Sequence, residues 1–316
     1  MAAALTVLIP THGRATLLER TLDSLAACPK PTIYRETVVV ENGPQEGAEA
    51  LVAARPAGER VRYLYVERAN KSHALNEALE TVAPGLVVFF DDDVRLAPDI
   101  LDAYDAAAAG RERGAFFGGP FSIDYEEAPP DWLRPHFPFS ARGVEFDDWP
   151  RPDYFLGFNW AAFADDIQEA GGFDPNHGPG SPTGASGQES SMQRLLRRRG
   201  TEQIKVPGAR VWHYVPRARC SPAWALHRKY RAGLEKGNRL RTEAARRRLL
   251  TVAEYAARSA LAAARWSAHA VLRNRQAQFG ERAALKKHLG VLAGYLAGRE
   301  AGEAVPRTAA SREVAL

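Results

Sequence analysis

The chain of 316 residues is poor in cysteine and lacks long uncharged apolar runs. Its two cysteines, Cys28 and Cys220, are far apart in the sequence, which gives no disulfide framework and fits a reducing compartment. The first residues show no basic region before a long apolar run, so we expect no secretory signal and a cytoplasmic protein. Glu254, Arg258 and Arg265 interrupt the most apolar window of the C-terminal part, which argues against a simple transmembrane anchor.

The charge is distributed unevenly along the chain, although the formal net charge is only +4. Residues 1–193 hold 15 Lys and Arg against 30 Asp and Glu, a net charge of −15, and residues 194–316 hold 27 against 8, a net charge of +19. This asymmetry suggests an anionic partner for the C-terminal part, either a nucleic acid or an anionic membrane surface. A solvated basic face, or one that pairs with the acidic first half, explains the pattern equally well.

The first 121 residues alternate segments that are typical of strands with segments that are typical of helices. Right-handed crossovers in such a series give a mainly parallel, Rossmann-like α/β sheet with helices on both faces. The predicted strands are 5–10, 37–42, 61–66, 86–90 and 115–121, and the predicted helices are 17–27, 48–54, 72–82 and 99–109.

The rest of the chain changes character twice. Residues 124–153 are rich in Pro, Trp and acidic residues, which predicts an irregular excursion on the substrate side. Residues 174–189 contain four glycines and three prolines, which is typical of a loop that changes shape, such as a lid. Residues 224–296 favour helix nearly throughout, and Gly290, Gly294 and Gly298 share one face, where they either permit close packing or weaken the helix.

Three consecutive carboxylates, Asp91, Asp92 and Asp93, follow the apolar strand 86–90 directly. In an open α/β sheet the ligand crevice lies beyond the carboxyl ends of such strands. Carboxylates this close repel one another unless a hard divalent cation neutralises them, and oxygen ligands favour Mg²⁺ or Mn²⁺ with open positions for phosphate. A solvated acidic loop that caps the helix beginning near Pro98 is the alternative.

Further polar residues stand at the predicted crevice. Thr11, Glu41 and Asn42 at the tips of the first two strands have hydrogen-bonding groups that suit a base and its ribose, although Asn42 also fits a simple turn. Lys71 opens the helix before the aspartates, with Asn76 five residues later. A lysine near a helix N-terminus suits a diphosphate, whereas an exposed lysine is the plain alternative.

Eight motifs follow one another over about residues 5 to 230: LIPTHGR (8–14), VVVENGP (38–44), NKSHALNEAL (70–79), FFDDDV (89–94), GFNWAAF (157–163), GGFDP (171–175), GQESSMQRLL (187–196) and VWHYVP (211–216). In this order they resemble the motifs of the inverting family 2 glycosyltransferases of the GT-A fold. The helical tail resembles that of bacterial members that build surface polysaccharides.

The resemblance implies a metal-dependent transfer of a sugar from a nucleotide diphosphate sugar to a hydroxyl of a glycan or lipid-linked acceptor in cell-surface polysaccharide synthesis. A UDP-sugar is the favoured donor, with GDP- and dTDP-sugars as alternatives, and Mn²⁺ or Mg²⁺ is the cofactor. It also implies a location in the cytoplasm or peripherally at the inner face of the cell membrane. The implied domains are a GT-A domain at 1–230, divided into a nucleotide-sugar-binding half at 1–121 and an acceptor half at 122–230, and a basic helical extension at 231–316.

The resemblance also assigns roles on the donor side. Asp91 and Asp93 match the ends of the family's Asp-x-Asp motif, which implies a metal site formed by Asp93, Asp91 and His213, with Asp93 on the cation and Asp91 nearer the ribose. His213 resembles the histidine that completes the metal site, although a lone histidine between two aromatic residues is more often a core residue. The residues expected to contact the nucleotide sugar are Pro10, Thr11, Glu41, Asn42, Lys71, Asn76, Asp91 and Asp92.

Glu189 resembles the catalytic base, with one departure. The family's loop ends in Glu-Asp, whereas this chain has Gln188 and Glu189, so the first acid is neutral and the second is one methylene longer. An inverting transfer needs one carboxylate to take the acceptor's proton. A helix-start carboxylate is the alternative. Contact with the acceptor is expected from residues of the acidic, aromatic middle, which also suit a core or loop anchor: Asn159, Trp160, Asp153 and Trp132.

Two other classes of function fit parts of the sequence. A sugar nucleotidyltransferase also uses carboxylates on an α/β sheet, but it normally has a Gly-rich, basic segment after the first strand, where this chain has only Gly13 and Arg14. A nucleic-acid-binding protein would explain the basic half. That half contains no zinc, helix-turn-helix or aromatic RNA-binding signature, so we expect no nucleic-acid partner.

Overall fold

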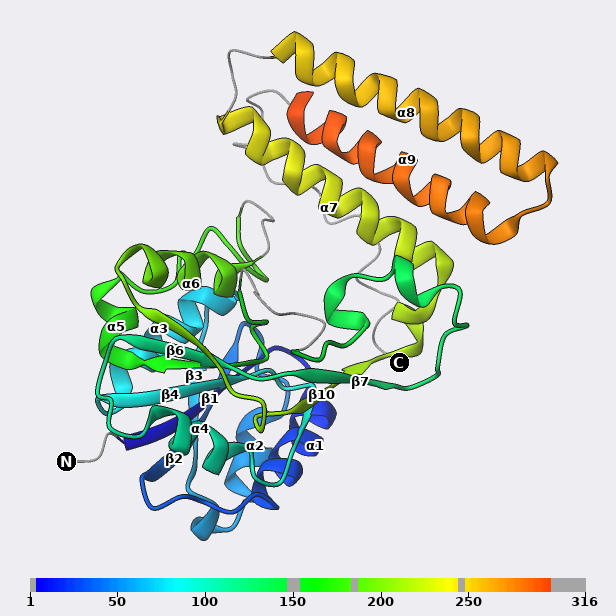
Figure 1. The fold of residues 1–316 in the computed structure, drawn as a ribbon. Coiled ribbons are helices and arrows are strands. Elements are labelled where there is room, and N and C mark those ends of the chain that lie inside the picture. Colours follow the sequence, from blue (N-terminus) through cyan, green and yellow to red (C-terminus); the bar gives the residue numbers. More distant parts are fainter. Residues whose placement is uncertain (1–3, 147–153, 183–186, 244–247, 297–316) are drawn as a thin grey trace. The chain divides into compact units, whose positions relative to one another are not determined.

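A computed structural model of the chain describes residues 4–146, 154–182, 187–243 and 248–296 (Figure 1). The chain divides into two compact units. The α/β unit comprises Met1–Ala128 and Phe139–Arg217, and the helical unit comprises Pro129–Pro138 and Ala218–Leu316. The boundary expected at residue 230 therefore falls inside a helix, and part of the expected acceptor half belongs to the helical unit.

A seven-stranded sheet in the order β3-β2-β1-β4-β8-β6-β9 is the centre of the α/β unit. β1 pairs in parallel with β2 and with β4, whereas β8 is antiparallel to both β4 and β6. The strand order reverses between β1 and β4, which confirms the mainly parallel α/β fold. The strands are β1 (Ala4–Thr11), β2 (Tyr34–Asn42), β3 (Val61–Val66), β4 (Gly85–Phe90), β6 (Ala115–Gly118), β8 (Asn159–Phe163) and β9 (Glu202–Lys205).

A second sheet of three strands lies in the order β5-β10-β7, with β5 (Val94–Leu96), β7 (Phe121–Tyr125) and β10 (Val211–Val215). The single strand predicted at 115–121 is thus two strands in two sheets. The chain changes sheet at Gly119, where a Cβ atom would collide with the carbonyl of Ala209, and at Pro120, which has no N–H for a ladder. Because β5 follows the aspartates, its antiparallel pairing with β10 brings His213 to their side.

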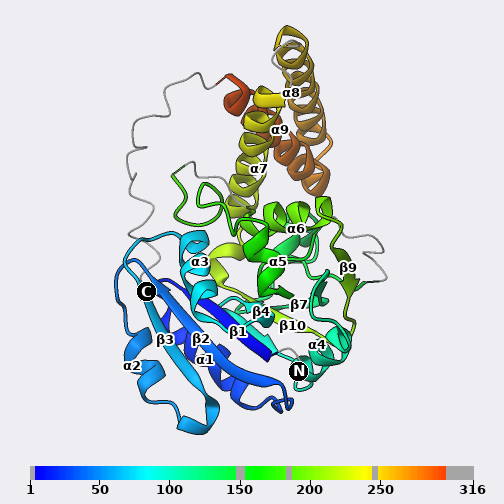
Figure 2. The same cartoon turned by 90° about the vertical axis from the view of Figure 1, so that its left-hand side faces the viewer.

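Helices cover both faces of the large sheet, as predicted. Figures 1 and 2 show α3, α5 and α6 on one side of it and α1 and α2 on the other, and α4 packs on the same side as α1. The helices are α1 (Ala15–Ala26), α2 (Ala48–Ala53), α3 (Lys71–Thr81), α4 (Ile100–Ala108), α5 (Ala164–Glu169) and α6 (Gln188–Arg198), with short 3-10 turns at Ala57–Glu59 and Phe139–Ala141.

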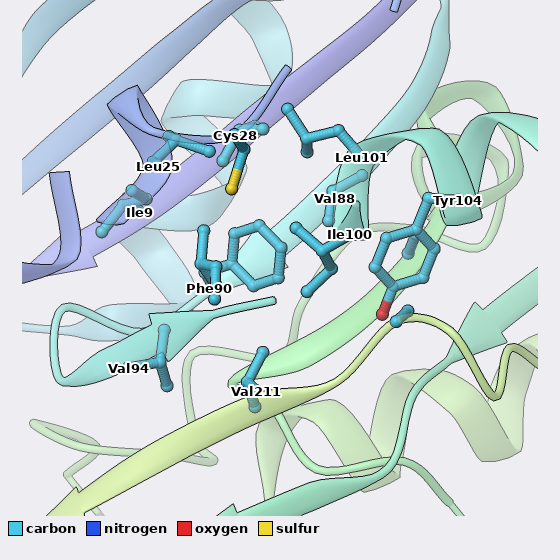
Figure 3. Close-up of a cluster of buried hydrophobic side chains, with 14 of the residues drawn as sticks. Ile9, Leu25, Cys28, Val88, Phe90, Val94, Ile100, Leu101, Tyr104 and Val211 are labelled. Carbon is cyan, nitrogen blue, oxygen red and sulfur yellow. The ribbon is translucent and has the colours of Figure 1, made fainter. Parts of the chain in front are cut away.

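The alternation of side chains along each strand divides the apolar residues between two core clusters. On β4, Val88 and Phe90 join one cluster, and Val87 and Phe89 join the other. Figure 3 shows the first cluster, where Phe90 meets side chains from α1 and α4. A strand that is buried on both faces carries polar residues only where it leaves the sheet, so the aspartates mark that point.

The helical unit contains α7 (Pro222–Glu243), α8 (Arg248–Val271) and α9 (Arg275–Leu296), and α9 packs against both of the others (Figure 1). A Cβ atom at Gly290 or Gly294 would collide with a backbone carbonyl of α7. Gly290 and Gly294 therefore permit close packing of α7 on α9, whereas Gly298 lies outside the described residues. None of the helices in the described ranges has both the length and the apolar character needed to cross a bilayer.

The segment Pro129–Pro138, which includes the 3-10 turn Arg134–His136, packs on these helices. The Trp132 ring meets Phe279 of α9 edge to face at 5.3 Å, and Phe137 meets Trp224 of α7 at 5.6 Å. This part of the irregular excursion therefore has a structural role in the helical unit, and the acceptor contact expected of Trp132 stays a prediction.

Candidate functional site

Each of the three aspartates after β4 has a cationic partner from the chain itself. Arg14 donates from Nε to Asp92 Oδ2 at 3.1 Å and from Nη1 to Asp93 Oδ2 at 2.7 Å, and its Nη2 contacts Asp92 Oδ1. Lys71 Nζ donates to Asp91 Oδ1 at 2.5 Å. The expectation that only a divalent cation neutralises this triplet is therefore wrong, because two basic side chains from other elements compensate most of its charge.

The second carboxylate oxygen of Asp93 lies beside His213. Asp93 Oδ1 is buried and accepts no hydrogen bond from the residues that the structure describes, and His213 Nε2 lies 3.6 Å from it. His213 Nδ1 is 2.9 Å from the carbonyl oxygen of Ser140. Since a carbonyl only accepts, Nδ1 is the donor of this bond, and Nε2 is the ring nitrogen that is turned toward Asp93.

This oxygen and nitrogen pair fits a divalent cation such as Mn²⁺. Within the described ranges no group of three or more His, Cys, Asp or Glu side chains is arranged to hold a metal ion. The chain's own side chains there supply only part of a coordination sphere, which leaves most positions for oxygens of a ligand or water. His213 also stacks on Phe158, with ring centroids 4.4 Å apart, so its imidazole is held in place.

Asp92, the middle aspartate of the triplet, has a structural role. Asp92 is fully buried and accepts a hydrogen bond from Thr11 Oγ1 at 2.7 Å, in addition to its contacts with Arg14. Burial raises the pKa of the Asp92 carboxyl to about 7, against the opposing effect of Arg14. Asp92 ties the end of β1 to the end of β4 and is turned inward, so the structure does not present it to a nucleotide as expected.

Asp91, the first aspartate of the triplet, and Lys71 form a half-buried ion pair. Burial alone raises the pKa of Asp91, but the ammonium of Lys71 outweighs it, and the pKa is lowered. Burial likewise opposes the charged form of Lys71, yet Asp91 and, more weakly, Glu189 raise its pKa. Both groups are therefore charged, and the ammonium of Lys71 interacts favourably with the aspartate triplet and with the carboxylate of Glu189.

The structure brings the expected base contacts Thr11, Glu41 and Asn42 together at the paired tips of β1 and β2. Asn42 Nδ2 donates to the backbone oxygen of Thr11 at 2.9 Å. Glu41 is buried and accepts from the Tyr63 hydroxyl at 2.6 Å and from the Glu46 amide at 2.8 Å. These bonds fix the strand tips, and Tyr63 orients the carboxylate of Glu41.

A pocket of about 210 Å³, open solvent included, joins the expected nucleotide side to the expected base. Trp160 stacks on Phe89, with ring centroids 4.6 Å apart, and contributes to the wall while only 1% exposed. A Cβ atom at Gly157 would lie 3.3 Å from Glu189 Cδ, so the glycine leaves room for this carboxylate. The lining residues are Pro10, Lys71, Leu75, Phe89, Gly157, Trp160, Phe173, Gln188 and Glu189.

Glu189 lies in the first turn of α6, after Gly187 with φ of 84°. The glycine-rich loop before it is partly described, and its first half is fastened to the start of α3. Lys71 N donates to Pro179 O at 3.1 Å, and Ser72 Oγ donates to His177 O at 2.7 Å. The expected lid is thus anchored at one end beside Lys71, while residues 183–186 lie outside the described residues.

Two asparagines that we expected to face ligands are engaged within the fold. Asn76 Nδ2 donates to the Phe173 carbonyl at 2.8 Å, and Asn76 Oδ1 accepts from the Phe173 amide at 2.7 Å. Asn159 is 1% exposed, donates to the carbonyls of Pro120 and Ala209, and accepts from the Tyr104 hydroxyl. Both side chains have their main hydrogen bonds inside the protein, so they are anchors of the fold. Asp153 lies outside the described residues.

Sequence reasoning missed Arg14 and Tyr63 as parts of this site. Arg14 carries a usable signal, since a cation just beyond the first strand stands next to whatever follows the neighbouring fourth strand. Tyr63 carries none, because its place beside Glu41 depends on the pairing of β2 with β3.

Residues 2–136 match a family model described as "Glycosyltransferase like family 2". A search of curated proteins finds no match. Among solved structures, the mannosyltransferase PcManGT from Pyrobaculum calidifontis in complex with GDP-Man and Mn²⁺ aligns with a TM-score of 0.56 and 22% identity, over 92% of this chain and 88% of that chain. GalNAc-T7 with UDP, GalNAc and Mn²⁺ aligns with a TM-score of 0.51 and 15% identity, over 68% of this chain and 44% of that chain. These two likenesses support the fold.

Proposed function

From the premise that this chain is a glycosyltransferase of the GT-A fold with a family 2 domain in residues 2–136, we propose that it transfers a sugar from a nucleotide diphosphate sugar to an acceptor hydroxyl with inversion. The observation that carries the proposal is that one pocket is lined both by Pro10 and Lys71, at the end of β1 and the start of α3, and by Glu189. Donor and base sides of a direct displacement meet there.

In the proposed reaction, the Glu189 carboxylate takes the proton of the acceptor hydroxyl while that oxygen bonds to the anomeric carbon. The bond from the anomeric carbon to the diphosphate oxygen breaks, and its electron pair leaves with the nucleoside diphosphate. Lys71, charged and beside the helix N-terminus of α3, stabilises this leaving group.

The residues that would hold a divalent cation are Asp93 and His213, through Oδ1 and Nε2. A bound Mn²⁺ or Mg²⁺ supplies Lewis-acid stabilisation of the departing diphosphate. Asp91 stays near Lys71, where its carboxylate orients the ammonium. PcManGT was solved with GDP-Man and GalNAc-T7 with UDP. A GDP-sugar therefore belongs among the candidate donors beside the UDP-sugar that we favour.

The test is a thermal shift panel of UDP-, GDP- and dTDP-sugars with Mn²⁺ or Mg²⁺. A matching donor at about 100 times its dissociation constant is expected to stabilise the protein by about 2.7 kcal/mol, or roughly 5–10 °C for a unit of this size. Absence of a shift with every donor and both metals would contradict the proposal. Formation of pyrophosphate from a nucleoside triphosphate and a sugar phosphate would instead indicate a nucleotidyltransferase, and salt-sensitive RNA binding alone would indicate a nucleic-acid-binding protein.

We further propose that the helical unit holds the enzyme at an anionic membrane surface, where a lipid-linked acceptor would be found. Leu249, Leu250 and Leu261 of α8 are 85%, 69% and 51% exposed, on the side opposite Tyr255 and Ala262, which are buried. Residues 218–316 contain 20 Lys and Arg against 7 Asp and Glu, a net charge of +13. A second copy on this face would bring like charges together, whereas an anionic leaflet attracts them and takes up the leucines.

We expect the protein to float with vesicles of phosphatidylcholine and phosphatidylglycerol, but not with pure phosphatidylcholine, and to be released by high salt. The double variant Leu250→Glu, Leu261→Glu should lose flotation, whereas Leu289→Glu, at an exposed position of α9, should retain it. Equal binding to both vesicles, or to neither, would refute the membrane role. A concentration-dependent dimer that the double variant abolishes would assign the face to a second copy.

A further inference from the structure

The geometry points to a role for Arg14 that rests on the proposed function: we propose that Arg14 is a positioning residue that holds Asp93 so that its free oxygen, together with His213, receives the divalent cation of the donor complex. Arg14 is the residue directly before α1, and its carbonyl accepts the amides of Leu17 and Leu18 at 3.0 Å each. Its backbone is therefore fixed by the first turn of the helix. The side chain reaches across from β1 to the residues after β4.

The guanidinium uses three nitrogens on two consecutive carboxylates. Nε and Nη2 contact Asp92, and Nη1 contacts Asp93 Oδ2. A planar fork with five donors can bridge two carboxylates in this way, whereas the point charge of a lysine cannot. Because Oδ2 of Asp93 is occupied, the carboxylate has one orientation, and Oδ1 is the oxygen left beside His213 Nε2 at 3.6 Å.

The burial of the two carboxylates makes this orientation depend on Arg14. Asp92 and Asp93 are 0% and 6% exposed, and two buried carboxylates side by side repel each other. Without the fork, Asp93 is expected to turn away from Asp92, and rotation about its side-chain bonds would also displace Oδ1 from His213. Groups that orient a metal ligand from behind typically contribute about 10- to 100-fold to metal affinity.

The positive charge of Arg14 acts in the opposite direction, since it repels a nearby metal ion. The two effects separate in different variants. Arg14→Lys keeps the charge and removes the fork, so it isolates positioning, whereas Arg14→Gln removes both the charge and the fork. If repulsion dominated, Arg14→Gln would bind Mn²⁺ more tightly than the wild type.

The experiment measures free Mn²⁺ by electron paramagnetic resonance during a Mn²⁺ titration of the full chain, with saturating UDP in one series and saturating GDP in another. Arg14→Lys is expected to raise the apparent dissociation constant for Mn²⁺ by about 10- to 100-fold, and Arg14→Gln is expected to raise it as well. The matched control is Arg62→Lys, because Arg62 grips Glu36 with two nitrogens at 2.9 and 3.1 Å and is 36% exposed, against 37% for Arg14.

Unchanged Mn²⁺ affinity in folded Arg14→Lys, or tighter Mn²⁺ binding by Arg14→Gln, would overturn the positioning role. Nucleotide affinity in EDTA provides a second readout. If the Arg14 variants lose nucleotide affinity in EDTA by the same factor as in Mn²⁺, Arg14 acts directly on the phosphates and the proposal fails. If Arg14→Lys does not fold, the Arg14→Gln titration decides alone. A wild-type protein that binds neither nucleotide with Mn²⁺ is titrated with dTDP, and no binding of dTDP either would instead refute the proposed function.

Discussion

Glu189→Gln is expected to lower kcat by about 10²- to 10⁴-fold, which is the usual contribution of a general base, and to leave donor affinity nearly unchanged. The amide keeps the size and hydrogen bonding of the side chain but cannot accept the acceptor's proton. Gln188, its neighbour in the pocket, is neutral and cannot replace it. The pair that we propose for the cation, Asp93 and His213, is untouched by this substitution, so the loss should appear in turnover rather than in binding.

The measurement is steady-state kinetics together with nucleotide binding, and the anomeric configuration of the product is read by nuclear magnetic resonance. Glu202→Gln is the matched control, because Glu202 is an exposed carboxylate on β9 that pairs with Arg111. Near-normal turnover of Glu189→Gln would show that Glu189 is not the general base. A product with retained configuration would rule out single displacement altogether.

Asp93→Ala is expected to abolish the stabilisation that Mn²⁺ and donor together provide, and excess EDTA is expected to abolish transfer in the wild type. The reason is that Asp93 Oδ1 is the buried carboxylate oxygen that faces His213. The fold should survive, because Arg14 keeps its two contacts with Asp92 and the end of β1 stays tied to β4 through Thr11.

Thermal shift with and without metal checks this second result. Asp102→Ala, at an exposed position on α4, serves as the control and should behave like the wild type. Full transfer activity in EDTA, or donor-dependent stabilisation of Asp93→Ala equal to that of the wild type, would contradict a metal at this position.

Local patterns in the sequence were sufficient to predict the alternation of strands and helices, the mainly parallel sheet and the position of the aspartates at the carboxyl end of β4. Each of these depends on the periodicity of apolar residues within about ten positions. The change of sheet at Gly119 was not predicted, because its cause is the distant carbonyl of Ala209. The same holds for the segment Pro129–Pro138, whose aromatic partners lie on α7 and α9.

The site was predicted in composition but less well in its pairings. The partners of the aspartates come from far along the chain, Arg14 on the loop after β1 and Lys71 at the start of α3. The hydrogen-bond partners of the amide side chains could not be predicted, since an asparagine offers the same groups to a ligand and to a backbone. Asn76 and Asn159 donate their amide hydrogens to backbone carbonyls within the fold. These carbonyls belong to Phe173, Pro120 and Ala209, which are distant in the sequence, so only the three-dimensional structure reveals the bonds.

The packing of Pro129–Pro138 has a consequence for how such a protein is inherited and dissected. The chain passes between its two units three times, after residues 128, 138 and 217. A gene shortened after residue 217 would still encode Trp132 and Phe137, but not Phe279 and Trp224, against which they pack. In such a product the rings of Trp132 and Phe137 would lack their packing partners and would lie in a loop within the α/β unit. A single recombination junction therefore cannot transfer the complete helical unit to another protein, because the unit is made of two separate segments of the chain. The loop Pro129–Pro138 and the helices have to change together.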